Sequence, residues 1–341
     1  MTIDRLVLGA SSLVGEVELL DDMTFSGRAS VARLRLRDGG TVVAKLAFDA
    51  GAHAREAAAL QTLPESVRPQ LLAAGAGVLV MEDLGPGPSL ANLLLGDDPD
   101  AAAAALIAWA RTLGATLRPS MRTGSAADPE AAGEGMVGLL GLAGDLGVTV
   151  PAAVEDDMVL VESVLARPGP WLAFCPGDTC PDNDRILPDG SVKLFDFEAA
   201  EWRHAALEGA YCRAPFCTCW CQGRLPEGMA QRMEAAFLAA LAPPDPEAFV
   251  EAIALASVHF VLLTFRWMRR WVGEGRALAP KAPATGPQYA YERLHTLAAL
   301  GERLPALSAV ARELAGRVVD RWPDATAMPA YPAFAGLPAA E

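Results

Sequence analysis

Three polar side chains in residues 177–198, GDTCPDNDRILPDGSVKLFDFE, have types and spacing that suit metal-dependent chemistry. Asp178 and Asn183 stand with four residues between them, and Asp196 follows in the second half of the stretch. Carboxylate and amide oxygens are the ligands that hard cations such as Mg²⁺ prefer, and a carboxylate can also take a proton from a reacting hydroxyl. The stretch therefore indicates either a metal-assisted reaction or a solvated acidic turn.

A calcium loop of the EF-hand type does not fit these residues. Such a loop needs oxygen ligands at its first, third and fifth positions, a glycine at the sixth and a glutamate at the twelfth. That pattern fails when it is counted from Asp178 or from Asp182.

The acidic residues lie on two connected structural pieces. Pro188–Gly190 is a turn signal, and the apolar residues Val192, Leu194 and Phe195 after it predict a short strand. The rest of the chain must therefore decide between a site and a solvated turn.

The first 84 residues are predicted to be rich in strands. In ASVARLRLR, apolar residues alternate with arginines, DGG then turns the chain, and TVVAKLAF forms a second strand that carries Lys45. A helix, AHAREAAALQTL, follows and carries Glu56, and GVLVMEDL is an apolar strand that GPGPS ends. A small-residue loop around Gly27 precedes the hairpin.

Beyond that break the pattern is helical. We predict helices over residues 99–117, 151–166, 228–241, 246–271 and 289–319, and the only strand signals in this half surround the acidic stretch. The apolar segment Phe249–Phe265 contains Glu251 and is short for a membrane span, so we interpret it as a buried helix.

Length and charge limit the class of protein. A chain of 341 residues predicts one large domain or two closely packed ones. A net charge of -14 argues against a nucleic-acid or anionic-membrane binder, which needs clustered Lys and Arg. The amino terminus shows no signal peptide, and we expect a cytoplasmic protein.

Four of the six cysteines cluster in CRAPFCTCWC, at Cys212, Cys217, Cys219 and Cys221. Their spacing differs from that of paired zinc knuckles, so a metal site is the weaker interpretation. Without an export signal, reduced and partly buried thiols are expected, and the cluster is interpreted as chemically incidental. A redox role stays open.

The motifs PGDTCPDN and DFE resemble those of the aminoglycoside phosphotransferase and choline kinase-like family. In that family the catalytic loop usually reads H-G-D-x-x-P-x-N and the metal motif D-F-E or D-F-D. The resemblance covers residues 14–314. Pro176 stands where the family has histidine, and Cys180 and Asp182 replace a common histidine and glycine. These departures leave the three chemical groups in place.

The resemblance implies an α+β, bilobal protein-kinase-like fold. A small antiparallel-sheet lobe over residues 1–84 would bind the nucleotide, and a larger, mainly helical lobe over residues 85–341 would hold the catalytic loop and the acceptor site. The implied activity is ATP- and Mg²⁺-dependent phosphorylation of a small-molecule hydroxyl, an aminoglycoside-like antibiotic or a metabolite. The alternative is a nucleotide-binding pseudokinase or regulatory module of the same fold.

The resemblance also assigns roles to single residues. Asp178 would act on the acceptor hydroxyl, and Asn183 and Asp196 would bind Mg²⁺. Lys45 would contact the nucleotide phosphates and Glu56 would hold Lys45. Taken alone, Lys45 reads as an exposed strand lysine and Glu56 as a surface charge, but their order ahead of the acidic motifs favours the functional interpretation.

Two further segments are expected at the nucleotide. The loop over the phosphates comprises Ser26, Gly27, Arg28 and Ser30. The backbone facing the adenine comprises Glu82, Asp83 and Leu84.

The acceptor itself cannot be identified from the sequence. Acidic residues of the helical half suit a cationic acceptor such as a polyamine, but the same residues also suit a solvated helix face, which we favour. Nucleotide preference, activity and oligomeric state are open as well.

Overall fold

The computed structural model describes residues 2–24, 27–125, 131–277, 279, 281–326 and 328–336. The chain divides into two compact units. The first comprises residues 1–89, 174–179 and 183–201, and the second comprises residues 90–173, 180–182 and 202–341. The acidic stretch therefore belongs mostly to the first unit, apart from residues 180–182.

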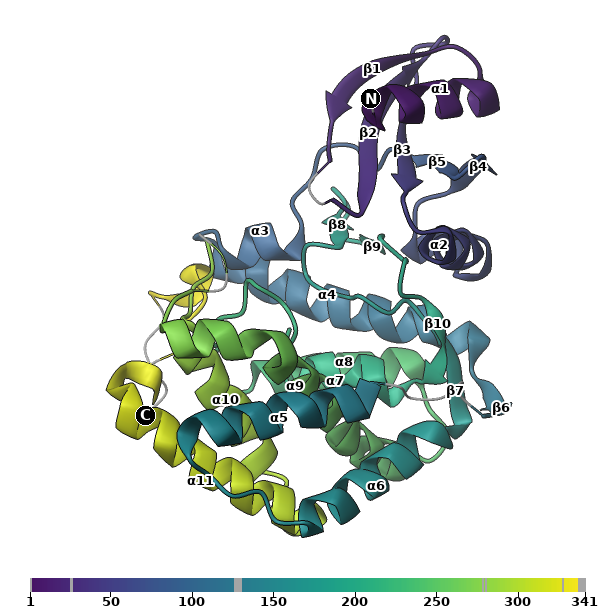
Figure 1. Cartoon of the computed structure of the whole chain (residues 1–341). Coiled ribbons are helices and arrows are strands. Elements are labelled where there is room, and N and C mark those ends of the chain that lie inside the picture. Colours follow the sequence, from purple (N-terminus) through teal and green to yellow (C-terminus); the bar gives the residue numbers. More distant parts are fainter. Residues whose placement is uncertain are drawn as a thin grey trace. The chain divides into compact units, whose positions relative to one another are not determined.

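A five-stranded antiparallel sheet of order β1-β2-β3-β5-β4 forms the first unit (Figure 1). Its strands are β1 (Val17–Asp22), β2 (Ala29–Leu36), β3 (Thr41–Ala47), β4 (Leu71–Gly75) and β5 (Val78–Glu82). Helix α1 (Thr2–Val14) packs on the sheet, and its Leu6 and Ala10 are buried against Leu34, Val42 and Val80. The alternation of apolar residues in β2 and β3 creates this buried face.

Helix α2 (Ala50–Thr62) follows β3 directly. Asp49 caps its first turn, because the carboxylate accepts a hydrogen bond from the backbone N–H of Ala52 at 2.6 Å. The cap sets where the helix begins, and thus the position of Glu56 on its buried side.

The acidic stretch folds as a hairpin of β8 (Asp184–Ile186) and β9 (Val192–Leu194). Asp184 is opposite Leu194, and Ile186 is opposite Val192. Gly190 has a φ of 80°, which the turn requires and which glycine adopts without strain. The predicted turn and short strand therefore occur where expected.

The second unit is mainly helical (Figure 1). Its helices are α3 (Leu90–Leu94), α4 (Pro99–Leu117), α5 (Ala131–Leu146), α6 (Ala153–Ala166), α7 (Ala206–Arg213), α8 (Met229–Leu241), α9 (Pro246–Glu274), α10 (Gly286–Ala298) and α11 (Pro305–Arg321). Short strands β6 (Arg122–Gly124), β7 (Gly169–Cys175) and β10 (Glu201–His204) form a sheet of order β10-β7-β6.

Several elements separate this fold from the sequence prediction. Helices α1, α3, α5 and α7 and strands β4 and β6 were not predicted. The predicted helix over residues 289–319 is wrong, because the segment forms two helices. Gly301 has a φ of 55° between them, and Pro305, which has no backbone N–H to donate, begins α11.

Helix α9 contains the one segment, among the described residues, that is long and apolar enough to cross a membrane, Pro246–Arg266. In its most apolar window, 72% of the residues are buried within the fold. This burial agrees with the interpretation of Phe249–Phe265 as a core helix.

Candidate functional site

Lys45 lies at the centre of a buried charge cluster in the first unit. Its Nζ is 2.6 Å from Glu56 Oε2 and also donates a hydrogen bond to Asp196 Oδ1. Lys45 and Glu56 are only 7% and 1% exposed. The structure thus brings together three residues that the sequence predicted to act in one site, Lys45, Glu56 and Asp196.

Opposing effects set the charge state of this cluster. Burial lowers the pKa of Lys45, but Glu56 and Asp196 outweigh burial and hold that pKa above its ordinary value. Burial raises the pKa of Glu56, and the neighbouring Lys45 opposes that rise. Lys45 is therefore protonated at neutral pH, with carboxylates on two sides.

Asp196 and Asn183 are placed by the open end of the β8–β9 hairpin. Asn183 immediately precedes β8, and its carbonyl accepts a hydrogen bond from Phe195 N–H at 3.0 Å. Its side-chain Nδ2 donates to the carbonyl of Asp178 at 3.1 Å, which leaves Oδ1 as the acceptor of the amide. Asp196 has a φ of 64°, an uncommon conformation for a residue with a Cβ.

Gly177 explains the start of the catalytic-loop motif. Its φ is 95°, and a Cβ at this position would lie 2.2 Å from the carbonyl oxygen of Ala199. Any other residue would therefore force apart the chain before Asp178 and the chain after Asp196. The glycine allows the two acidic segments to approach each other.

The segment expected near the adenine has its side chains engaged. Glu82 accepts hydrogen bonds from Lys193 Nζ at 2.8 Å and from Gln70 N–H at 3.0 Å. Asp83 accepts from Arg33 Nε at 2.8 Å and from Gly85 N–H at 3.0 Å, and Leu84 is partly buried. The role of this backbone toward adenine stays a prediction.

The predicted phosphate loop is described in part. Ser26 lies outside the described residues, and Gly27 begins the part of the loop that is described. Ser30 is a residue of β2, paired with Leu46 and only 3% exposed. Arg28 is largely exposed, and its guanidinium is 2.9 Å from Glu198 Oε1.

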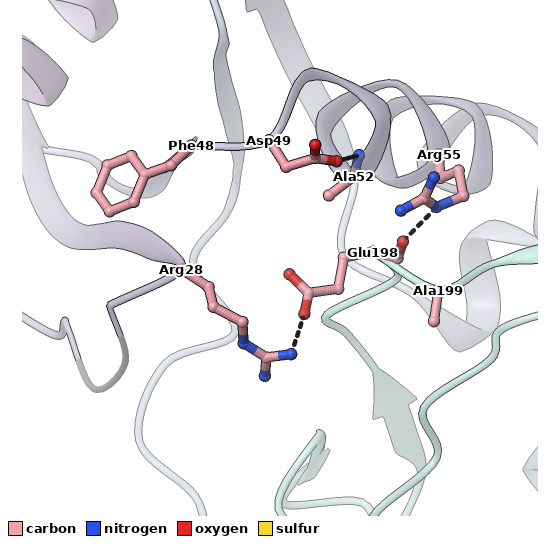
Figure 2. A pocket seen from close by; sticks show the side chains of 7 residues that line it. All are labelled: Arg28, Phe48, Asp49, Ala52, Arg55, Glu198 and Ala199. Carbon is pink, nitrogen blue, oxygen red and sulfur yellow. Dashed lines mark hydrogen bonds and ion pairs between the residues drawn. The ribbon is translucent and has the colours of Figure 1, made fainter. Parts of the chain in front are cut away.

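A cavity of about 480 Å³ lies beside this loop in the first unit (Figure 2). It is lined by Arg28, by residues 48–55 around the start of α2, and by Glu198 and Ala199. Glu198 joins its walls: the carboxylate pairs with Arg28, and the carbonyl accepts from Arg55 Nε at 2.6 Å. Glu198 is the last residue of the DFE motif, but its motif position predicted no role for it, and no local pattern pointed to Arg55.

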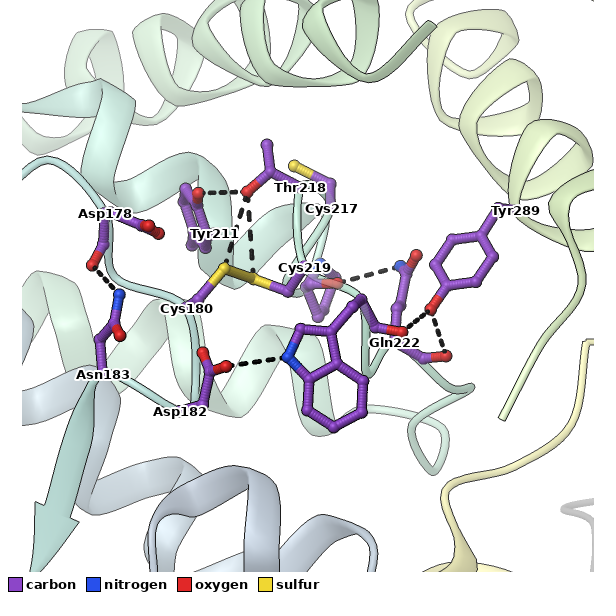
Figure 3. The surroundings of a disulfide bond; sticks show 12 residues. Asp178, Cys180, Asp182, Asn183, Tyr211, Cys217, Thr218, Cys219, Gln222 and Tyr289 are labelled. Carbon is purple, nitrogen blue, oxygen red and sulfur yellow. Dashed lines mark hydrogen bonds between the residues drawn. A yellow bond between two sulfur atoms is a disulfide. The ribbon is translucent and has the colours of Figure 1, made fainter. Parts of the chain in front are cut away.

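The cysteines differ from the expectation. Cys180 and Cys219 form a disulfide (Figure 3), whereas Cys175, Cys212, Cys217 and Cys221 are buried thiols. The prediction of six reduced, incidental thiols is therefore wrong for this pair. The two residues are separated by 39 positions, so only folding brings them together, and Cys180 in the motif loop was the one available signal.

Comparison with known sequences identifies no relative. No protein-family model matches the sequence, and no curated protein matches it.

Comparison with solved structures identifies the fold. A putative fructosamine-3-kinase from Thermobifida fusca aligns with a TM-score of 0.52 and 18% identity over 91% of this chain and 96% of that one. The amicoumacin kinase hAmiN, in complex with AMP-PNP, Ca²⁺ and Ami, aligns with a TM-score of 0.50 and 10% identity over 90% of this chain and 91% of that one. At such identities the likeness speaks for the fold alone. The chain thus has the protein-kinase-like α+β fold that these small-molecule kinases share.

Proposed function

We propose that the protein is an ATP- and Mg²⁺-dependent phosphotransferase that acts on a hydroxyl of a small molecule in the cytoplasm. The observation that carries the proposal is the buried contact of Lys45 with both Glu56 and Asp196. A protonated lysine held beside a carboxylate that would bind the metal ion suits phosphoryl transfer, since catalysis consists mainly of positioning and charge neutralisation. The fold shared with two named kinases supports the same reaction class.

The residues fit a magnesium ion held jointly with a nucleotide. Among the described residues no three His, Cys, Asp or Glu side chains cluster as a metal site. Asn183 Oδ1 and the Asp196 carboxylate nevertheless supply two oxygen donors, and Mg²⁺ is commonly bound by one or two protein oxygens with phosphates and water. When bound, the ion would neutralise charge on the transferred group.

Asp178 has the proposed role of acting on the acceptor. Its carboxylate would orient the acceptor hydroxyl and take the proton as the new oxygen–phosphorus bond forms and the bond to the β-phosphate oxygen breaks. Lys45 would meet the nucleotide phosphates, with Glu56 holding its position. Residues 26–30 and the backbone of residues 82–84 would contact the phosphates and the adenine.

The two predicted lobes divide this work. We propose that residues 1–84 bind the nucleotide and that residues 85–341 contribute the catalytic loop and the acceptor site. The acceptor class stays open between cationic antibiotics and neutral metabolites.

Calorimetric titration with MgATP tests the nucleotide site. We expect Asp196→Ala to weaken MgATP binding at least about tenfold, because even residues behind the direct ligands cost 10–100-fold in metal affinity. The matched control is Asp189→Ala, which removes the same charge from the exposed turn of the same hairpin and should leave the affinity unchanged. Equal affinities of wild type and Asp196→Ala would move the nucleotide site elsewhere.

A screen for acceptor-dependent ADP formation then separates the enzyme from the pseudokinase. Amino sugars, macrolides, choline, amino alcohols and sugars are suitable acceptors. MgATP binding without ADP formation above background, across the whole screen, would favour the pseudokinase.

A further inference from the structure

The catalytic-loop motif carries a disulfide in its middle. Cys180 stands two residues after Asp178 and three before Asn183, and it is joined to Cys219 with a Cα–Cα distance of 5.8 Å. Because each residue spans at most about 3.6 Å, the Cα atom of Asp178 lies within about 7 Å of that of Cys180. Whatever restrains Cys180 therefore also restrains the proposed catalytic residue.

Two further contacts hold residues 180–182 within the second unit. The carbonyl of Pro181 accepts a hydrogen bond from Ala91 N–H at 2.7 Å. The carboxylate of Asp182, which Figure 3 labels, accepts one from Trp220 Nε1 at 2.8 Å. The disulfide and the indole both come from the segment that contains Cys219 and Trp220, so this segment anchors residues 180–182. Breaking the disulfide would leave these residues held by non-covalent contacts, among them the two hydrogen bonds of Pro181 and Asp182.

The two bonded cysteines differ in the exposure of the whole residue. Cys219 is only 2% exposed, whereas Cys180 is partly exposed. Thr218 Oγ1 lies 4.0 Å from Cys180 Sγ and 3.9 Å from Cys219 Sγ, and it is 2.5 Å from the Tyr211 hydroxyl. Cys180 is therefore the more accessible residue of the pair, and the Thr218 hydroxyl lies near both sulfurs.

Neighbouring thiols do not compete with this exchange. Cys217 and Cys221 each lie two residues from Cys219 but are buried. Burial raises the pKa of Cys217 to about 11, so almost none of it is the nucleophilic thiolate at neutral pH. Burial of both thiols disfavours internal rearrangement of the Cys180–Cys219 pairing.

We propose that Cys180 and Cys219 form a reversible thiol–disulfide site that controls how firmly the catalytic loop is held. The oxidised pair fixes residues 180–182 to the segment of Cys219, and the reduced pair loosens them. In a reducing compartment such a link is typical of redox sensing rather than of a permanent staple. The thiol chemistry is independent of the proposed kinase function, and only its effect on MgATP binding rests on that function.

The exchange is a two-electron reaction with a dithiol reductant. A thiolate of the reductant attacks the Cys180 sulfur, the bond to Cys219 breaks, and Cys219 leaves as a thiolate that takes a proton. The second thiol of the reductant then displaces Cys180. The products are two protein thiols and the disulfide of the reductant.

The first experiment establishes the link. Alkylation of the denatured protein after incubation with oxidised glutathione should count four thiols, and alkylation after dithiothreitol should count six. Fragmentation of the linked peptides should identify Cys180 and Cys219 as the two joined residues. Six thiols after the oxidising incubation, or a different pairing, would overturn the proposal.

The second experiment measures loop mobility by hydrogen exchange. Dithiothreitol should increase exchange in residues 177–184 and 214–222 of the wild type. The double variant Cys180→Ser/Cys219→Ser is the matched control: its exchange should equal that of the reduced wild type and should not respond to dithiothreitol. A link whose reduction leaves exchange in both segments unchanged would also overturn the proposal, and this comparison needs only the wild-type protein.

The third measurement connects mobility to the nucleotide. We expect reduction to weaken MgATP binding by about fivefold, at the low end of couplings between sites, since non-covalent contacts still hold the loop. Absence of MgATP binding in both redox states would refute the proposed kinase function, while the hydrogen exchange would still decide the thiol–disulfide site. Equal MgATP affinity in the oxidised and reduced states would overturn the proposal that the Cys180–Cys219 pair controls the catalytic loop.

Discussion

The buried lysine of the first unit and two buried histidines of the second unit lie in different surroundings. In the first unit, the buried ammonium of Lys45 contacts two carboxylates, those of Glu56 and Asp196. In the second unit, His204 and His259 are buried, and among the described residues neither forms an ion pair. His204 instead packs against aromatic rings.

The difference separates groups that stay charged from groups that lose their charge. Burial lowers the pKa of His204 to about 4, and burial together with Arg203 lowers the pKa of His259 to about 4, so both imidazoles are neutral at pH 7. The carboxylates hold the pKa of Lys45 above its ordinary value although burial lowers it. A buried lysine that keeps its charge is suited to a charged ligand, whereas the two neutral, buried histidines serve packing.

The largest effect is expected at Asp178, and it tests whether the first unit's charges do chemistry. Asp178→Asn keeps the size of the side chain but cannot accept the proton as a base. Turnover of a verified acceptor should fall by about 10²–10⁴, while MgATP affinity stays within a few fold. Steady-state kinetics and calorimetry measure the two quantities. Asp189→Asn on the exposed turn is the control, and an Asp178→Asn enzyme as active as the wild type would remove Asp178 from the mechanism.

The next effect concerns the stability of the buried charge cluster. Lys45→Met should cost about 3–5 kcal/mol in the free energy of unfolding, because it leaves the carboxylate of Glu56 buried without its cation. The double variant Lys45→Met/Glu56→Gln should recover part of that loss. Urea denaturation measures both.

A contrasting pair lies on the surface of the same sheet. Arg35 and Glu18 have side chains that are 50% and 65% exposed. Arg35→Met should therefore cost less than about 1 kcal/mol. Similar losses for Arg35→Met and Lys45→Met would show that burial does not distinguish the two pairs.

The third prediction concerns acid destabilisation of the second unit. The folded-state pKa values of His204 and His259 lie near 4, below the value of 6.5 for an unperturbed histidine. The unfolded state therefore binds more protons between these pH values. The stabilisation is complete above pH 6.5 and is lost as the pH falls toward 4, at about 3 kcal/mol for each histidine.

Urea denaturation at several pH values, followed by tryptophan fluorescence, measures this loss. His204→Asn keeps an acceptor for the N–H of Ala206 and should flatten the fall in stability between pH 6.5 and 4. His295→Gln, at an exposed position, should leave the pH dependence unchanged. A His204→Asn variant with the wild-type slope would show that His204 does not carry the acid sensitivity.

Local patterns predicted much of the first unit. The alternation in residues 29–47 led to the β2–β3 hairpin with Lys45 in its second strand, and the turn at residues 188–190 led to the β8–β9 hairpin. Helix α1 and strand β4 were missed, because their burial depends on the assembled sheet rather than on a strong pattern of their own. The split of residues 289–319 into α10 and α11 was readable from Pro305 and was overlooked.

The candidate site also has a part that the sequence predicted and a part that only the fold shows. Asp178, Asn183 and Asp196 could be recognised as a group from their types and spacing, because one loop and one hairpin connect them. Their catalytic roles stay predictions. Lys45 contacts Asp196, and Arg28 pairs with Glu198. Each contact joins residues far apart in the chain, so the sequence around either residue does not predict the contact.

The cysteines show most clearly that a sequence does not specify which distant residues become partners. The amino-acid sequence by itself specified which groups were available: a carboxylate loop with Cys180 inside it, a strand lysine, a helix glutamate and a run of cysteines. Folding selected Cys219 from that run as the partner of Cys180 and buried Cys217 and Cys221 as thiols. Local spacing specifies turns and strands because they depend on neighbouring residues. Partners across 39 positions depend on how the whole chain packs, since a disulfide needs two Cα atoms within about 7 Å.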